Sequence, residues 1–61
     1  MKQISGVDEE GFYLLLNYET KDSEDMDEML SVLYNPEVDS KVKGYGDDHV
    51  EVIVRLDLEV L

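Results

Sequence analysis

Two groups of residues in this sequence have the types, though not the spacing, of metal ligands. His49 directly follows Asp47 and Asp48, and acidic residues recur through segment 22–27. A calcium-binding EF-hand loop needs oxygen ligands at alternate positions, then a glycine and a more distant glutamate, and segment 22–27 lacks that spacing. A single histidine beside a strand start is typical of an ordinary surface residue. We therefore expect no metal site and no cofactor.

The residues that catalysis or phosphate binding would need are also few. Gly44-Tyr45-Gly46 follows Lys43, but this segment has neither the length of a phosphate-binding loop nor a helix start after it. Nucleophilic catalysis needs a nucleophile with a nearby base, and the chain has one histidine and no cysteine. The sequence predicts a protein that is not an enzyme.

The carboxylates themselves are the remaining chemical feature. The 61 residues contain 16 Asp and Glu against 5 Lys and Arg, which gives a net charge of -11. A compact chain of this length is about 27 Å across, and a DNA duplex of that length carries roughly 16 phosphate charges. Such a surface repels nucleic acid and steers the protein toward basic partners. An alternative, that the acidity only keeps a small protein soluble, stays open at this point.

The length limits the chain to one domain, residues 1–61, and the composition limits how that domain can be stabilised. A domain this short buries only about 60% of the surface that its unfolded chain exposes. It has no cysteine for disulfides, so self-association is the expected reinforcement. No signal peptide or membrane-spanning stretch is recognisable, and we expect a cytoplasmic protein without membrane contact.

Apolar and polar residues alternate in three segments, which predicts three strands. The alternation is most regular in segment 50–60, whose even-numbered residues are all Val or Leu. Segment 12–19 alternates in the same way, and segment 2–7 does so more weakly. Gly11, in the short connection 8–11, can take the positive φ that tight hairpin loops often need. The chain is therefore expected to begin with a hairpin.

An apolar stripe between the second and third predicted strands indicates a helix. The stripe consists of Met26, Met29, Leu30 and Leu33, at helical spacing. Ser23 or Asp22 can accept hydrogen bonds from the first free amides. Asn35-Pro36 ends the helix, because proline disfavours helical geometry in the residue before it. Segment 37–48 is expected to be a loop that leads to the last strand.

This order of elements predicts an α+β fold, with a β-β-α-β protomer in which one helix packs on one face of an antiparallel sheet. An open sheet leaves unpaired edges, and the long, valine-rich final strand is the expected place for a second copy to pair. We therefore expect a twofold homodimer with a continuous sheet. Its interface is expected to consist of Val50, Val52, Val54, Leu56 and Leu58.

The predicted helix has two interpretations. By default its apolar stripe packs on the sheet as core. In a dimer, two such helices lying side by side would instead leave a cleft with an apolar floor and acidic rims, and methionine suits such an adaptable surface. A DNA mimic needs both charge and a hole if its target flips bases and inserts a hydrophobic side chain into DNA. The expected partner-binding residues are then Glu24, Met26, Asp27, Glu28, Leu30, Ser31, Leu33 and Tyr34.

Two stretches of the sequence resemble a known family. Val32-Leu33-Tyr34-Asn35 at the helix end, and the terminal run from Val54 to Leu61, are similar to small dimeric uracil-DNA glycosylase inhibitors encoded by some phages of Gram-positive bacteria. The resemblance covers roughly residues 22–61, and the order of elements and the acidity also match. It implies a phage protein that acts as a DNA mimic. In that family two copies form one antiparallel sheet with paired helices, and the cleft between the helices captures a hydrophobic side chain from the enzyme's DNA-intercalation loop.

Leu30 and Tyr34 occupy the matching helix positions, whereas Ser31 stands where the family has a glutamate. The loop after Pro36 is longer, and the terminal strand carries one added residue. The resemblance implies a stoichiometric, noncatalytic inhibitor of host uracil-DNA glycosylase, acting in the infected bacterial cell. Two alternatives stay open. One is a DNA mimic that binds another basic DNA-binding protein, such as a restriction, nucleoid or CRISPR protein, and the other is a structural oligomerisation domain.

Overall fold

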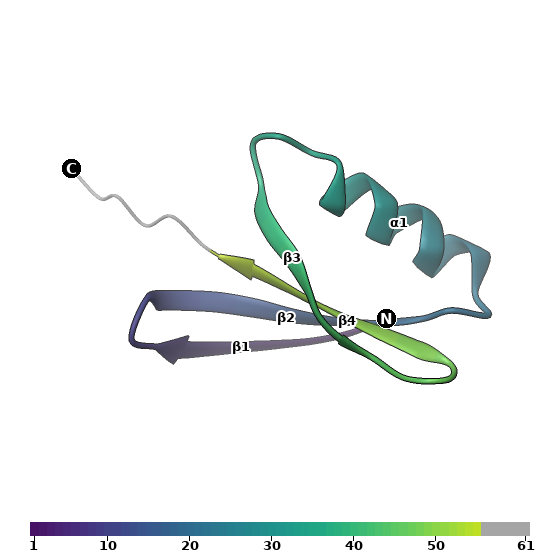
Figure 1. Cartoon of the computed structure of the whole chain (residues 1–61), viewed down its shortest axis with the longest axis horizontal. Coiled ribbons are helices and arrows are strands. Elements are labelled where there is room, and N and C mark those ends of the chain that lie inside the picture. The colour runs from purple at the N-terminus through teal and green to yellow at the C-terminus, as the bar shows by residue number, and fades with distance from the viewer. Residues whose placement is uncertain (56–61) are drawn as a thin grey trace.

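The structure, a computed structural model, describes residues 1–55. This part of the chain contains four strands and one helix in the order β1 (Lys2–Asp8), β2 (Gly11–Glu19), α1 (Ser23–Leu33), β3 (Asp39–Tyr45) and β4 (His49–Arg55). The strands form one sheet, and α1 lies over one of its faces (Figure 1). The predicted α+β class is confirmed, with one strand more than the sequence indicated. No helix within residues 1–55 is long and apolar enough to cross a membrane.

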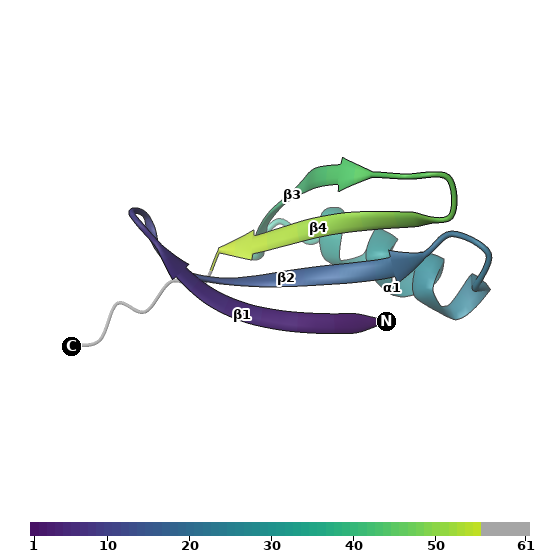
Figure 2. The same ribbon diagram turned by 90° about the horizontal axis from the view of Figure 1, so that it is seen from below.

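The sheet is antiparallel throughout, and its spatial order is β1-β2-β4-β3 (Figure 2). One row across it shows the register: Ile4 of β1 is opposite Leu15 of β2, which is opposite Ile53 of β4. Because β4 is antiparallel to both of its neighbours, β2 and β3 run in the same direction. The helix α1 therefore connects two parallel strands across one face of the sheet, and β4 later fills the place between them.

Segment 39–45 corrects the sequence prediction, which placed a loop over 37–48. This segment forms β3 and pairs with β4 from Asp39 opposite Arg55 to Tyr45 opposite Val50, with a bulge between Val42 and Gly44. The β3 sequence is rich in polar residues and contains a single β-branched apolar residue, so its own strand preference is weak. The pairing is instead decided by β4, whose second edge would otherwise stay open.

The last strand, β4, is internal to the sheet, whereas the sequence prediction treated it as an edge. It pairs with β2 on one side and β3 on the other, so between residues 49 and 55 no backbone edge is left for a second copy. Val50, Val52 and Val54 lie in or against the protomer's own core, and their part in a dimer interface stays a prediction. Leu56 and Leu58, and the remainder of the predicted strand 50–60, lie outside the described residues. The homodimer itself stays a prediction.

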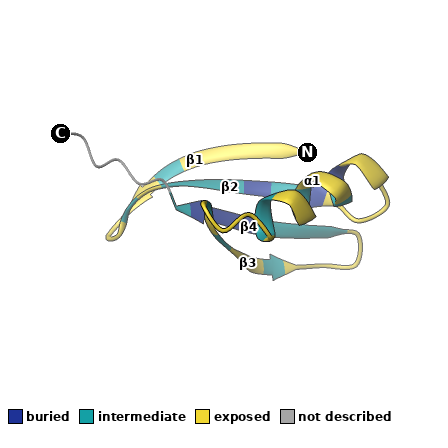
Figure 3. Ribbon diagram, turned by 90° about the horizontal axis from the view of Figure 1, so that it is seen from above, coloured by how far each residue is buried: buried dark blue, intermediate teal, exposed yellow. Residues whose placement is uncertain are grey.

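The core lies between α1 and one face of β2 and β4 (Figure 3). Tyr18 and Val52 are fully buried there, and Leu16 and Val54 complete the cluster. The helix covers this cluster with Met26, Met29, Val32 and Leu33. The prediction of an amphipathic helix seated on the sheet is confirmed.

The first hairpin is closed by a glycine and attached to β4 by an ion pair. Gly11 takes the predicted positive φ, 114°. Asp8, at the end of β1, accepts a hydrogen bond from Arg55 Nη1 at 2.7 Å. Across the hairpin, the Tyr13 ring lies so close over Gly6 that a Cβ at position 6 would overlap the phenol group. The hairpin is thereby fixed to the rest of the sheet.

Candidate protein-binding surface

The helix α1 begins at a side-chain cap. Asp22 has an extended backbone, and its Oδ1 accepts hydrogen bonds from the amides of Glu24 at 3.0 Å and Asp25 at 3.4 Å. Glu24 and Asp25 lie in the first turn, where the partial positive charge of the helix N-terminus favours carboxylates. These acidic residues therefore help to start the helix, and no basic residue follows them within α1.

One of the helix carboxylates is turned inward. Asp25 is only 7% exposed, and its Oδ2 accepts a hydrogen bond from the Glu19 amide at 2.9 Å. The same oxygen lies 3.4 Å from the amino group of Met1. Asp25 therefore anchors the start of the helix to the end of β2 and is not available to a partner.

The outward face of α1 combines carboxylates with large apolar side chains. Leu30 is 44% exposed and Tyr34, at the helix C-cap, is 80% exposed. These two positions are one helical turn apart, so their side chains are neighbours. We call this surface the acidic helix face, and it consists of Glu24, Asp27, Glu28, Leu30, Ser31 and Tyr34, all exposed.

The structure divides the eight predicted partner-binding residues into two groups. Six of them form the acidic helix face. The other two, Met26 and Leu33, pack against the core, so the default interpretation holds for them. The buried side of the helix runs from Val32 through Met29 and Leu33 to Met26, and Leu30 lies beyond its Met26 edge, about 100° around the helix axis from Met29. Val32, which the stripe omitted, packs against the core instead.

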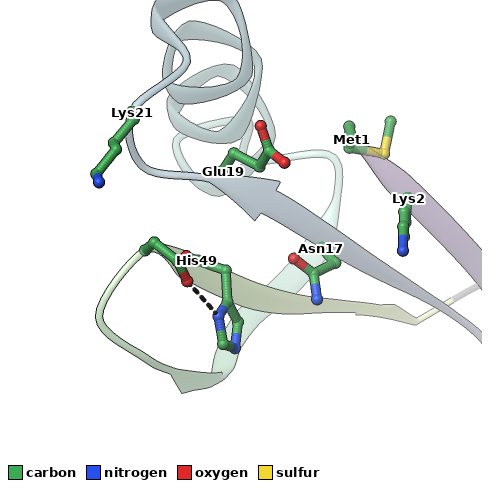
Figure 4. A pocket seen from close by; sticks show the side chains of 7 residues that line it. Met1, Lys2, Asn17, Glu19, Lys21 and His49 are labelled. Atoms are coloured by element: carbon green, nitrogen blue, oxygen red, sulfur yellow. Dashed lines mark hydrogen bonds and ion pairs between the residues drawn. The ribbon is translucent and has the colours of Figure 1, made fainter.

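Two pockets of the protomer lie away from the acidic helix face. The larger has a volume of about 360 Å³ and lies where β2 ends and β4 begins (Figure 4). Its lining consists of Met1, Lys2, Asn17, Glu19, Lys21, Asp48 and His49. A smaller pocket of about 80 Å³ is bordered by Ile53 and Arg55. The expected cleft between two helices would form only in a dimer, and neither of these protomer pockets corresponds to it.

A cluster of three carboxylates lies at the start of the helix, in a different combination from the one the sequence suggested. Oxygens of Glu19, Asp22 and Asp25 lie within 4.8 Å of one another. Asp22 caps the helix by accepting a hydrogen bond from the Glu24 amide, and Asp25 accepts a hydrogen bond from the Glu19 amide. Because these backbone contacts account for the arrangement, the cluster needs no metal ion to explain it. His49 Nδ1 lies 3.2 Å from Asp48 Oδ1 and belongs to the larger pocket instead.

Three of the five basic residues lie on the opposite face of the sheet. Strand pairing places Lys2, Lys41 and Arg55 on the side away from α1, because side chains alternate between the two faces and Val52 and Val54 face the helix. Arg55 also lies 5.7 Å from the centre of the Tyr13 ring. Its hydrogen bond to Asp8 lowers the pKa of that carboxyl group. The protomer therefore has one face of mixed charge and one that is acidic.

The core contains one polar group without a partner. The hydroxyl of Tyr18 is buried and forms no hydrogen bond among the described residues. Burial raises the pKa of Tyr18, and the nearby carboxylates of Glu28 and Asp25 raise it further. An unpaired buried hydroxyl lowers stability by about 1–3 kcal/mol relative to a paired one.

Comparison with known proteins gives no independent assignment. No protein-family model matches the sequence, and no curated protein and no solved structure matches the chain. The functional argument therefore depends on the residues of the acidic helix face and on the sequence resemblance described above.

Proposed function

We propose that this chain is a stoichiometric, noncatalytic inhibitor of host uracil-DNA glycosylase. It would act in the cytoplasm of a phage-infected bacterium, as a homodimer that occupies the DNA-binding cleft of the enzyme by mimicry. The observation that carries the proposal is the exposed pair Leu30 and Tyr34, set among carboxylates on a helix whose core contacts are made by other residues. The resemblance to phage glycosylase inhibitors assigns these same two positions to contact with the enzyme.

The charge of the acidic helix face supports a partner that normally binds DNA. Its carboxylates, Glu24, Asp27 and Glu28, are all exposed. The net charge of -11 would draw the protein toward a positively charged cleft over a long range. Electrostatic attraction of this kind mainly speeds association and selects the partner, so charge alone does not account for slow release.

The apolar pair would supply the slow release. Aromatic side chains are over-represented among the residues that dominate the energy of protein interfaces. An enzyme that flips a base out of DNA also fills the opened stack with a side chain, and apolar wedges of this kind need an apolar surface to bind. Leu30 and Tyr34 offer such a surface, and the resemblance implies that the second copy's helix would complete the cleft around the inserted side chain.

A second candidate is a DNA mimic that binds another basic DNA-binding protein, such as a restriction, nucleoid or CRISPR protein. The acidic surface favours this candidate as much as the first. The two differ in the apolar pair, because a target that inserts no hydrophobic side chain gains little from Leu30 or Tyr34. Loss of binding in Leu30→Glu would favour the glycosylase, whereas loss only on neutralising the carboxylates would favour the other targets.

The direct test is titration of a purified uracil-DNA glycosylase with this protein, following uracil release from a DNA substrate at low and moderate salt. We expect complete inhibition near one dimer per enzyme, and we expect it to persist at moderate salt because the apolar contact is not screened. Leu30→Glu should abolish it, while Lys43→Glu on β3, which also adds a carboxylate, should not. Full enzyme activity at micromolar inhibitor would refute the proposal.

A further inference from the structure

The sheet has two outer strands, and only one of them is protected against further pairing. β3 carries the protections that natural edge strands use, namely a bulge between Val42 and Gly44 and two lysines, Lys41 and Lys43. β1 has neither. It pairs with β2 over seven residues without a register shift, and segment 3–7 contains no charge and no proline. Among residues 1–55, no strand pairs with the outer edge of β1, which is therefore a regular row of free backbone groups.

We propose that β1 pairs with β1 of a second copy, antiparallel, about a twofold axis at Ser5. In this register Lys2 is opposite Asp8 of the second copy, and Asp8 is opposite its Lys2. Lys2 thus meets an opposite charge, Asp8 gains a second one beside the Arg55 that it already binds in the protomer, and all seven residues are paired. The proposal deepens the homodimer of the proposed function, but it does not depend on which enzyme the dimer binds.

The faces of the strand agree with this register. Residues directly opposite each other in a sheet point to the same side, and side chains alternate along a strand. A twofold axis normal to the sheet must therefore pair even-numbered residues of one β1 with even-numbered residues of the other, and odd with odd. In the proposed register Ile4 lies opposite Gly6 of the second copy. Ile4 is 62% exposed in the protomer, and Gly6 is covered by the Tyr13 ring. Pairing would therefore bring Ile4 next to an aromatic ring and remove it from water.

Neighbouring registers are less favourable. An axis at Ile4 would leave Asp8 without an opposite residue in β1, and it would place Lys2 opposite Gly6. An axis at Gly6 would leave Lys2 unpaired and place the apolar Ile4 opposite the charged Asp8. Charge complementarity therefore selects the axis at Ser5 among the registers that keep the faces aligned.

The same axis fixes where the two helices lie. A twofold axis normal to the sheet leaves both α1 helices on one side of an eight-stranded sheet. Since α1 packs over β2 and β3 rather than β1, the strip between the helices is made of β1 and its copy. The two β2 strands would be about 14 Å apart, three times the usual strand spacing of about 4.8 Å.

The first test is the mass of the protein in solution, measured by light scattering at micromolar concentration. We expect about 14 kDa, twice the mass of the 7.0 kDa chain. Ser5→Lys should give the monomer mass, because it places two lysines opposite each other at the axis while Ser5 is exposed in the folded protomer. Ser31→Lys, the same change on the exposed helix, should stay dimeric. A monomeric wild-type protein would overturn the proposal.

The second test identifies the strand and the register by cross-linking, and it uses the absence of native cysteine. Ser5→Cys should form a disulfide-linked dimer under mild oxidation, because opposite residues lie within disulfide range. Ile4→Cys should link at least about tenfold more slowly, since its two copies would be more than about 7 Å apart. Faster linking through Lys43→Cys than through Ser5→Cys would place the interface on β3 and overturn the assignment.

These tests do not involve the glycosylase, so the two proposals can fail separately. A cross-linked Ser5→Cys dimer without enzyme inhibition would leave the β1 interface standing and remove the proposed function. Enzyme inhibition by a protein that is monomeric, or that links through β3, would leave the inhibitor function standing and remove the β1 interface.

Discussion

Replacing Tyr34 with alanine should weaken binding to uracil-DNA glycosylase and leave the fold intact. The contribution of Tyr34 to folding is made by its backbone amide, which donates to the Leu30 carbonyl at 3.0 Å and is kept in alanine. A buried tyrosine removes about 150–250 Å² from water, and with the side chain 80% exposed, about 120–200 Å² of this remains for a partner to cover. At about 25 cal/mol per Å², the ceiling is about 3–5 kcal/mol. We expect about 2 kcal/mol, a roughly 30-fold rise in Kd.

The assay is a titration of the enzyme by each variant, with circular dichroism and light scattering to show that fold and mass are unchanged. Tyr45→Ala is the matched control, because Tyr45 is 82% exposed but lies at the end of β3. Its Kd should stay within about twofold of the wild-type value. An unchanged Kd for Tyr34→Ala, or an equal loss for both variants, would refute the assignment of the apolar contact to the acidic helix face.

Changing Glu24, Asp27 and Glu28 to their amides should slow association with the basic target by about tenfold at low salt and leave dissociation nearly unchanged, because exposed charges act mainly by steering. Stopped-flow binding at two salt concentrations measures this, and an effect confined to dissociation would contradict it. Tyr18→Phe should leave the free energy of unfolding unchanged or raise it by up to about 1 kcal/mol, because the hydroxyl that it removes is buried and unpaired. Urea unfolding measures this, and a clear loss of stability would show that the hydroxyl has a partner. Asp8→Asn should reduce the loss of stability in acid. The pKa of Asp8 is lowered in the folded state by Arg55, so its stabilisation is present above the unfolded pKa of about 3.9 and is lost as pH falls through the folded pKa. Urea midpoints across this range should converge for the two proteins, and parallel curves would refute the role of the ion pair.

The parts of the fold that the sequence could predict are those set by local patterns. The hairpin at Gly11 needs a positive φ, which the residue type allows. The helix follows from a capping residue, an apolar stripe and a proline stop, and the structure shows it from Ser23 to Leu33. The even-numbered residues of β4 pack as the alternation indicates, because one face of a half-buried strand must be apolar.

The parts that the sequence could not predict depend on neighbours that are distant along the chain. β3 is a strand because β4 offers it an open edge to pair with. Its own sequence, with two lysines and a glycine, lacks the alternation of apolar residues that would predict a strand. Its presence makes β4 internal, and this moves the free edges to β1 and β3. Asp25 is buried for a similar reason, since it accepts a hydrogen bond from the backbone amide of Glu19, at the end of another element.

The placement of the acidic residues separates those that the fold uses from those that it does not. Asp25 binds a backbone amide and Asp8 binds Arg55, so each is satisfied within the protomer. Asp27 and Glu28 lie beyond the first turn, where the helix dipole no longer favours them, and neither takes part in an ion pair within residues 1–55. At a net charge of -11 they add repulsion, and Glu28 raises the pKa of the buried Tyr18. Their amide variants should therefore be at least as stable as the wild type. A basic partner, as proposed above, would give these carboxylates the opposite charge that residues 1–55 of the protomer do not provide.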